Sequence, residues 1–174
     1  MRTSGRQRSE EEAKRIQGKN AAIFRNNQFV SISTRSGSGV LGMDPQGAHH
    51  LLPPDATDEV LGHALLDALS KSRSISWGED PALSIQGLMA TNKIWQQSLM
   101  DQFKYKNRQQ LFKNMISCKV RLADGFITMK PLRHEGLEGW GGMKDPTLNV
   151  VISGEVPPSE IGAALRLTLD RCIP

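Results

Sequence analysis

The chain has 174 residues, a length that suits one domain with a real hydrophobic core and is short for two. Its residues are 38% hydrophobic and 23% charged, close to the averages for globular proteins, which excludes global disorder. The net charge is +4, and residues 1–20 carry most of it, with six basic and three acidic side chains. Because the rest of the chain is nearly neutral, the sequence pI of about 9.3 is weak evidence for binding to DNA or RNA.

Segments that direct a protein to a membrane or out of the cell are not evident. No apolar run approaches the ~20 residues needed to cross a bilayer, and residues 1–20 lack the apolar core of a secretory signal. We therefore expect a cytoplasmic protein without a membrane partner. Cys118 and Cys172 are the only cysteines, and we expect both to be reduced and buried, with no cofactor and no metal.

The N-terminal half begins with a polar stretch, residues 1–20, that we expect to be a disordered extension of a single domain formed by residues 21–174. Residues 28–34 are typical of a short strand. Residues 35–39 are expected to form a turn that leads to a second strand at Val40 and Leu41. After a cap at Thr57, apolar residues at three- and four-residue spacing predict a helix that ends at Leu69.

The middle of the chain predicts two more helices. Residues 70–83 have the composition of a surface connection, in which Trp77 is unexpected. Apolar spacing then predicts an amphipathic helix over residues 88–103 and a short one over residues 108–115. Basic residues surround the joint between these helices: Lys104, Lys106, Arg108 and Lys113.

The C-terminal part predicts strands and a closing helix. Two short runs flank Asp124-Gly125, a strong hairpin signal, and residues 148–152 suit an inner strand. A last helix is expected from about Ser159 to Arg171. The predicted fold class is α+β: a single domain with a central mixed or antiparallel sheet packed with about four helices, in the order β-β-α-α-α-β-β-β-α.

Two helical segments resemble each other. Residues 59–65, E-V-L-G-H-A-L, and residues 160–165, E-I-G-A-A-L, each follow a Pro-Pro pair and carry a Gly after the first apolar positions. We interpret the similarity as two helices that meet the same local demands on one sheet, in preference to a true duplication.

Histidines are the first candidates for chemistry. His49 and His50 are adjacent, and no Cys or carboxylate stands at metal-ligand spacing, so a metal site there is disfavoured. His134 lies beside Glu135, an arrangement that suits a general base. No Ser or Cys nucleophile is near them in the sequence, and a rim of contact residues explains the segment better. We expect no catalytic residues.

Several passages, in order and spacing, resemble the immunity proteins of contact-dependent growth inhibition (CDI) systems. They extend over most of the chain from about Phe29 to Cys172. The passages are L-L-P-P-D-A at 51–56 running on to L-S-K-S-R at 69–73, L-F-K-N-M at 111–115, R-H-E to Trp140 at 133–140, and I-G-A-A-L-R-L at 161–167.

This resemblance implies a binding protein that is not an enzyme. Such a protein blocks the C-terminal toxin domain of a CDI effector, often a nuclease that acts on transfer RNA, by tight and allele-specific binding. Because nuclease toxins tend to be basic, we expect an acidic contact surface, formed by Asp55, Asp58, Glu59 and Asp67 or by Glu135, Glu138 and Asp145. The predicted toxin-contact residues are Trp77, Arg133, His134, Glu135, Glu138, Trp140 and Asp145, with the two tryptophans as anchors.

Two other functions compete with this interpretation. The first is a nucleic-acid-associated module that uses residues 1–20 and the basic region from Lys104 to Lys113, with affinity that falls steeply with salt. The second is a small hydrolase centred on His134 and Glu135, which requires a shaped pocket that holds both groups.

Overall fold

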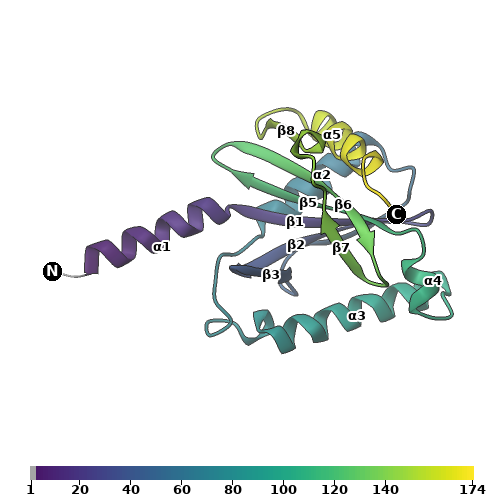
Figure 1. Ribbon diagram of the computed structural model, residues 1–174, viewed down its shortest axis with the longest axis horizontal. Helices are drawn as coiled ribbons and strands as arrows, with labels where there is room; N and C mark the ends of the chain where they lie inside the picture. Colours follow the sequence, from purple (N-terminus) through teal and green to yellow (C-terminus); the bar gives the residue numbers. More distant parts are fainter. Residues whose placement is uncertain (1–2) are drawn as a thin grey trace.

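The computed structural model describes the backbone of residues 3–174 and the side chains from Ser9 onward. Within those residues, one antiparallel sheet of eight strands forms the centre, and helices lie on both of its faces (Figure 1). The strands are β1 (Lys19–Arg25), β2 (Val30–Ser38), β3 (Val40–Met43), β4 (His49–Leu52), β5 (Ile116–Ala123), β6 (Phe126–Glu135), β7 (Gly139–Gly142) and β8 (Val150–Ser153). The helices are α1 (Thr3–Gln17), α2 (Asp58–Ser70), α3 (Ile85–Phe103), α4 (Arg108–Phe112) and α5 (Pro158–Asp170), with short 3-10 turns η1 (Pro81–Leu83) and η2 (Pro146–Leu148).

The sheet runs in the order β3-β2-β1-β5-β6-β7, with β4 beside β2 and β8 beside β6. At its centre, Ile23 of β1 lies opposite Ile32 of β2 and Cys118 of β5. The predicted α+β class and single sheet are confirmed, and the sheet is antiparallel. The observed order of elements contains the predicted one and adds α1, β1, β4 and β7.

The strands that the sequence did not reveal are short or lack alternation. Strand β1 is buried at five consecutive positions, so apolar and polar residues do not alternate along it. Strands β4 and β7 have only four residues each, His-His-Leu-Leu and Gly-Trp-Gly-Gly. Strand β2 also continues to Ser38 and so includes most of the segment 35–39 that was expected to form a turn.

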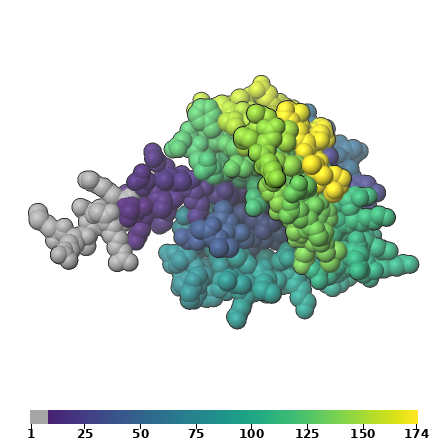
Figure 2. All heavy atoms as spheres, in the orientation of Figure 1, coloured from purple at the N-terminus to yellow at the C-terminus, as the bar shows by residue number. Residues whose placement is uncertain are grey.

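Helix α1 lies in the stretch that was expected to be disordered, so the structure differs from the prediction there. Its sequence is rich in strong helix formers, with Glu11 and Arg15 at the four-residue spacing of opposite charges. The helix projects from the body (Figures 1 and 2), and at its end the Gln17 amide donates to the Gly37 carbonyl at 2.9 Å and Arg121 donates to the Ile16 carbonyl at 2.7 Å. Residues 1 and 2 lie outside the described residues.

One face of the sheet, which we call the closed face, is covered by α2 and α5 (Figure 1). The two helices cross in direct backbone contact. A Cβ added at Gly62 of α2 would lie 1.8 Å from the carbonyl oxygen of Pro158, and one at Gly162 of α5 would lie 1.7 Å from that of Asp58. The similarity of the two helical sequences therefore has a physical cause, because each helix needs a glycine where the other begins.

The opposite face, which we call the groove face, is covered in part by α3 and α4. The segment that leads from α2 to α3 is fixed by Arg73. Its guanidinium donates to both carboxylate oxygens of Asp44, at 2.7 and 2.8 Å, and to Asp80 at 2.9 Å. Asp80 also caps η1. This cluster, which we call the Arg73 clasp, ties the start of α3 to the end of β3.

Candidate functional site

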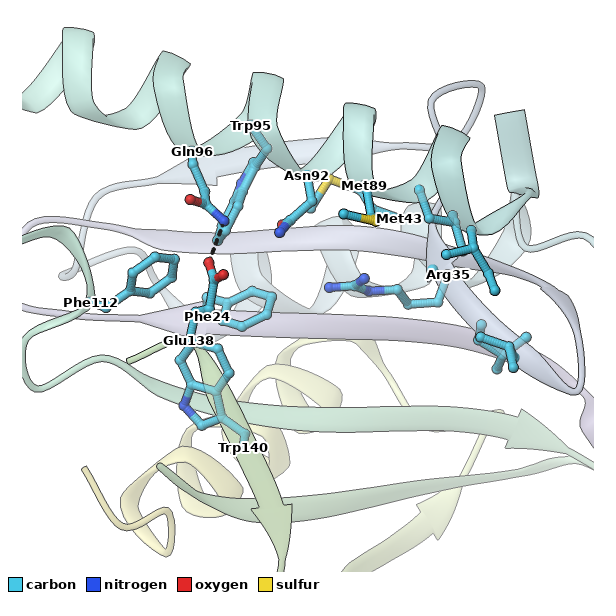
Figure 3. A pocket seen from close by; sticks show the side chains of 15 residues that line it. Phe24, Arg35, Met43, Met89, Asn92, Trp95, Gln96, Phe112, Glu138 and Trp140 are labelled. Carbon is cyan, nitrogen blue, oxygen red and sulfur yellow. Dashed lines mark hydrogen bonds between the residues drawn. The ribbon is translucent and has the colours of Figure 1, made fainter. Parts of the chain in front are cut away.

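The structure contains two adjacent cavities beside Phe24 and Arg35, one of about 370 Å³ between α3 and the sheet and one of about 320 Å³ lined by the strands and the β2–β3 turn. They share Phe24, Arg35, Leu41 and Trp140 in their walls, so we treat them as one groove. Figure 3 shows the larger cavity, with α3 above it and the strands below. Pockets of this size occur at the binding sites of many proteins.

The groove has an aromatic wall built from three separate elements. Alternation along β1 directs Phe24 to this face and Ile23 to the closed face. The ring of Phe24 lies 5.0 Å from that of Trp95 on α3 and 5.1 Å, edge to face, from that of Trp140 on β7. Such contacts are favourable beyond their buried area and hold the rings in fixed positions.

Trp140 is held on both of its sides. Its indole nitrogen donates to the carbonyl of Met115 at 3.3 Å, and the ring of His134 stacks on it at 4.7 Å and 9°. His134 in turn shares a hydrogen bond of 2.8 Å with the carbonyl of Leu137. Of the predicted contact residues, Trp140 therefore lines the groove, and His134 supports it from outside the two cavities.

A polar cluster crosses one end of the groove. Glu138, in the turn between β6 and β7, accepts a hydrogen bond of 2.7 Å from the Gln96 amide of α3 (Figure 3) and pairs with Arg108 at the start of α4. Arg108 belongs to the basic joint that the sequence indicated, so this cation is engaged within the protein. The carboxylate of Glu138 is already neutralised by that contact.

Arg35 lies at the centre of the groove without a matching acid. Its guanidinium points into the cavity (Figure 3) and lies 5.7 Å above the ring of Phe24. The Nε atom is buried and has no hydrogen-bond partner. Burial lowers the pKa of Arg35 to about 10, so the group is still charged at neutral pH.

The other charges around the groove do not compensate Arg35. Lys119, on the same face of β5, lines the smaller cavity together with Arg35. Among the described residues that line the two cavities, Glu138 is the only acid, and it is paired with Arg108. The groove therefore presents unbalanced positive charge to whatever enters it.

The rim of the groove is apolar and exposed at the end opposite Glu138. Val40 of β3 is 71% exposed, and Ile85 and Met89 on the first turns of α3 are 74% and 68% exposed. All three residues line the larger cavity. An apolar rim around a charged pocket is the pattern of a protein-binding surface.

The remaining predicted contact residues lie outside these cavities. Trp77 is 69% exposed in the connection between α2 and η1. Asp145 caps η2, where it accepts from the backbone nitrogen of Thr147 at 2.9 Å. Arg133 and Glu135 are exposed on β6 and pair with each other at 2.6 Å.

The arrangement does not support the hydrolase interpretation. His134 uses Nε2 to bond the Leu137 carbonyl, and Glu135 pairs with Arg133, so these two side chains do not form an acid–base pair. His49 and His50 lie on β4, where Nε2 of His50 is 2.7 Å from Asp67 and His49 contacts the Asp44 carbonyl. From residue 3 onward, no group of three His, Cys, Asp or Glu residues is placed to hold a metal.

The cysteines are both free and buried, as the sequence predicted. Burial raises the pKa of the Cys118 thiol and of the Cys172 thiol, which makes both of them poor nucleophiles at neutral pH. Across the described part of the chain, no helix combines the length and apolar character needed to span a membrane.

Sequence reasoning missed Arg35, Gln96 and Lys119 as site residues. One usable signal was present: in residues 29–35 the apolar residues alternate with Ser31, Ser33 and Arg35, which a strand would place on one face. Ending that strand at Thr34 removed Arg35 from it. Gln96 carried no signal, since its partner Glu138 is 42 residues away.

Comparison with known proteins shows where this architecture belongs. The model of the family described as CdiI, CDI immunity protein, matches residues 19–172. The chain is 36% identical over 167 residues to the immunity protein CdiI-YPIII of Yersinia pseudotuberculosis serotype O:3 (strain YPIII), covering 87% of this chain and 94% of that protein.

Solved structures agree with this match. A CdiA-CT/CdiI toxin and immunity complex from Yersinia pseudotuberculosis contains a chain that is 34% identical, with a TM-score of 0.82 and coverage of 88% of this chain and 97% of that one. A protein of unknown function from Neisseria meningitidis has the same identity and TM-score, with 88% and 94% coverage. The α+β fold is thus shared with the immunity protein of a toxin and immunity complex.

The chain belongs to the CDI immunity protein family. The resemblance seen in the sequence is confirmed. The matched range begins at Lys19, so α1 lies outside it.

Proposed function

We propose that this protein neutralises the C-terminal toxin domain of a CDI effector by binding it in the groove between α3 and the sheet. It acts in the cytoplasm and needs no catalysis of its own. The toxin is a nuclease, and transfer RNA is the substrate that the family resemblance implies. The observation that carries the proposal is the groove itself, which combines an exposed apolar rim with an unpaired cation.

Family membership and the solved toxin and immunity complex of a related protein support this proposal. Two of the seven contact residues predicted from the sequence, Glu138 and Trp140, line the groove, and a third, His134, stacks on Trp140. We keep Trp77, Arg133, Glu135 and Asp145 as contact candidates around it. The Glu138 carboxylate contributes by fixing the end of the groove, because Arg108 already balances its charge.

The first test is co-expression with the toxin domain encoded immediately upstream of this gene. We expect restored growth and a complex that co-purifies. The absence of both would remove the proposal and direct attention to salt-dependent binding of nucleic acid.

The second test locates the binding surface. Met89→Asp places a charge on the exposed rim of the groove, and we expect the toxin's Kd to rise at least about tenfold, a loss typical of a contact residue. Leu167→Asp is the matched control, because Leu167 is also exposed, at 47%, but lies on α5 at the closed face. Calorimetry on both variants shows which face of the protein binds the toxin. Equal loss in the two variants, or loss only in Leu167→Asp, contradicts the groove.

The acidic candidates provide a third test. Charge reversal at Glu135 and Glu138 together should weaken toxin binding, because it disturbs the Arg133–Glu135 pair on β6 and the polar cluster at the end of the groove. Glu155→Lys, an exposed reversal between β8 and α5, is the control. Unchanged affinity in a titration of the double variant counts against that surface.

A further inference from the structure

The position of Arg35 is costly for the isolated protein. A charged group that leaves water loses hydration, and proteins normally compensate it with an acid or several hydrogen bonds. The buried Nε of Arg35 has neither. Phe24 provides only a ring face at 5.7 Å, which compensates the charge weakly.

A second unsatisfied group lies on the same face of the same strand. Alternation along β2 places Ser31, Ser33 and Arg35 toward α3, whereas Thr34 points to α2, where its hydroxyl donates to the Ala68 carbonyl. Ser31 accepts from the Trp95 indole at 3.3 Å. The hydroxyl of Ser33, however, is buried without a partner. Two orphaned polar atoms on one strand face are unusual in a native protein, where nearly all such atoms are paired.

The acids that are near enough in the fold to help are used elsewhere. Asp44, at the end of β3, is occupied by the two guanidinium contacts of Arg73. Glu138 is occupied by Arg108 and Gln96. Arg73 and Arg108 are thus paired with acids of this chain, whereas Arg35 is not.

We propose that Arg35 is a specificity-determining residue that receives a carboxylate of the toxin. The occupant of the groove is an acidic segment of the toxin domain, in which one Asp or Glu side chain forms a two-pronged ion pair with the guanidinium, and Lys119 adds attraction at the neighbouring cavity. This inference rests on the proposed function. It reverses the charge that the sequence led us to expect, because at this point the immunity protein contributes the cation and the toxin the anion.

A carboxylate fits this site better than a nucleic acid does. The planar fork of arginine matches a carboxylate in two parallel hydrogen bonds. Binding of single-stranded nucleic acid depends on open aromatic faces for base stacking. Here the face of Trp140 is covered by His134, and Phe24 is enclosed by Trp95, Trp140 and Arg35. The site therefore offers one partly buried cation to one anion.

The test compares affinity with stability in the same variants. The toxin domain is used in a catalytically inactive form. In Arg35→Met the side chain keeps its length and loses its charge. We expect the Kd for the toxin domain to rise at least about 30-fold, because a toxin carboxylate is left buried and unpaired. Tm of the free protein should stay equal or rise, since an uncompensated charge is removed. Arg35→Lys should recover only part of the affinity, because it keeps the charge and loses the fork. Arg166→Met, on α5 at the closed face, is the matched control and should keep the wild-type Kd.

The outcomes separate the two proposals. If the wild-type protein binds the toxin and Arg35→Met binds it with equal affinity, the role of Arg35 is overturned and the proposed function stands. Wild-type protein that fails to bind the toxin overturns both. Unchanged toxin affinity combined with weaker binding of a single-stranded RNA oligonucleotide would show that Arg35 serves nucleic acid instead.

A double-mutant cycle identifies the toxin residue. Each Asp and Glu of the toxin domain is replaced by Arg in turn and titrated against Arg35→Glu. One reversed position should restore at least about tenfold of the lost affinity, because the swapped charges attract again. A full scan in which no toxin position couples to Arg35 overturns the proposal.

Discussion

The two faces of the sheet differ in how completely their helices cover them and in whether their buried polar groups are paired. On the closed face, α2 and α5 cover a continuous apolar cluster and touch each other through glycines, and buried polar groups such as Thr34 find partners. On the groove face, α3 leaves room for two cavities, and both orphaned polar atoms lie there. The difference indicates that the closed face provides stability and that the groove face provides unpaired polar groups for a partner.

The Arg73 clasp connects these two faces. It joins the end of α2, which belongs to the closed face, to Asp44 and to the cap of η1 ahead of α3. Asp44 is 0% exposed, so its negative charge depends on Arg73. The position of α3, and with it the width of the groove, is thus fixed by a buried ion pair outside the groove itself.

Breaking the closed face should have the largest effect. Gly162→Ala puts a methyl group 1.7 Å from the Asp58 carbonyl oxygen, so the helices must separate along their crossing. We expect the free energy of unfolding to fall by about 4 kcal/mol, above the usual range for overpacking because the obstacle is backbone. Urea denaturation measures the loss. Gly78→Ala, where the nearest atom is 3.7 Å away, should change stability little, and equal losses in the two variants would contradict the crossing as the cause.

Breaking the clasp should have a smaller effect, and one that extends to the groove. Arg73→Met leaves the buried Asp44 carboxylate unpaired, and we expect a loss of about 3 kcal/mol, reduced somewhat by the partial exposure of Arg73. Because α3 is released, toxin affinity should fall as well, although Arg73 does not line the groove. Denaturation and calorimetry are compared on the same samples. Lost stability with unchanged affinity would show that the groove keeps its shape without the clasp.

The helices of both faces were predictable from sequence, whereas the groove was not. Helices α2 and α5 follow from apolar spacing and from the shared Pro-Pro and Gly pattern, which are local signals. The groove depends on contacts between distant residues, such as Gln96 with Glu138 and Phe24 with Trp140. Whether a cation such as Arg35 has a partner is likewise a property of the fold and leaves no trace in the sequence around it.

Aromatic residues illustrate the same limit. Trp77 and Trp140 were equally prominent in the sequence as possible anchors, because both stand in segments rich in Gly or Ser. In the structure, Trp140 is part of the aromatic wall, and Trp77 is exposed in a connection away from both cavities. Their difference arises from strand β7, whose four residues pair with β6 and bring Trp140 beside His134. Such a short strand carries no periodic signal.

The smallest expected effect is on the pH dependence of folding stability. Burial alone would raise the pKa of Asp44, but hydrogen bonds from Arg73, Ser36 and the backbone of Gln46 hold it below the usual 3.8. A lowered carboxyl pKa stabilises the folded state above the unfolded pKa, and this stabilisation is lost as pH falls through the folded pKa. In wild-type protein, the contribution of Asp44 therefore disappears on acidification below about pH 3.8.

In Arg73→Met the sign is opposite, because burial without the arginine raises the pKa of Asp44 and makes its protonated form the favoured one. The stability of the variant should then increase as pH falls from neutral toward the unfolded pKa of about 3.8. The gap in Tm between the two proteins should narrow steadily from pH 7 to pH 3.5, while acids that do not contact Arg73, Asp67 among them, shift both proteins alike. A gap that stays constant over this range would mean that Arg73 stabilises the fold through packing and not through the charge of Asp44.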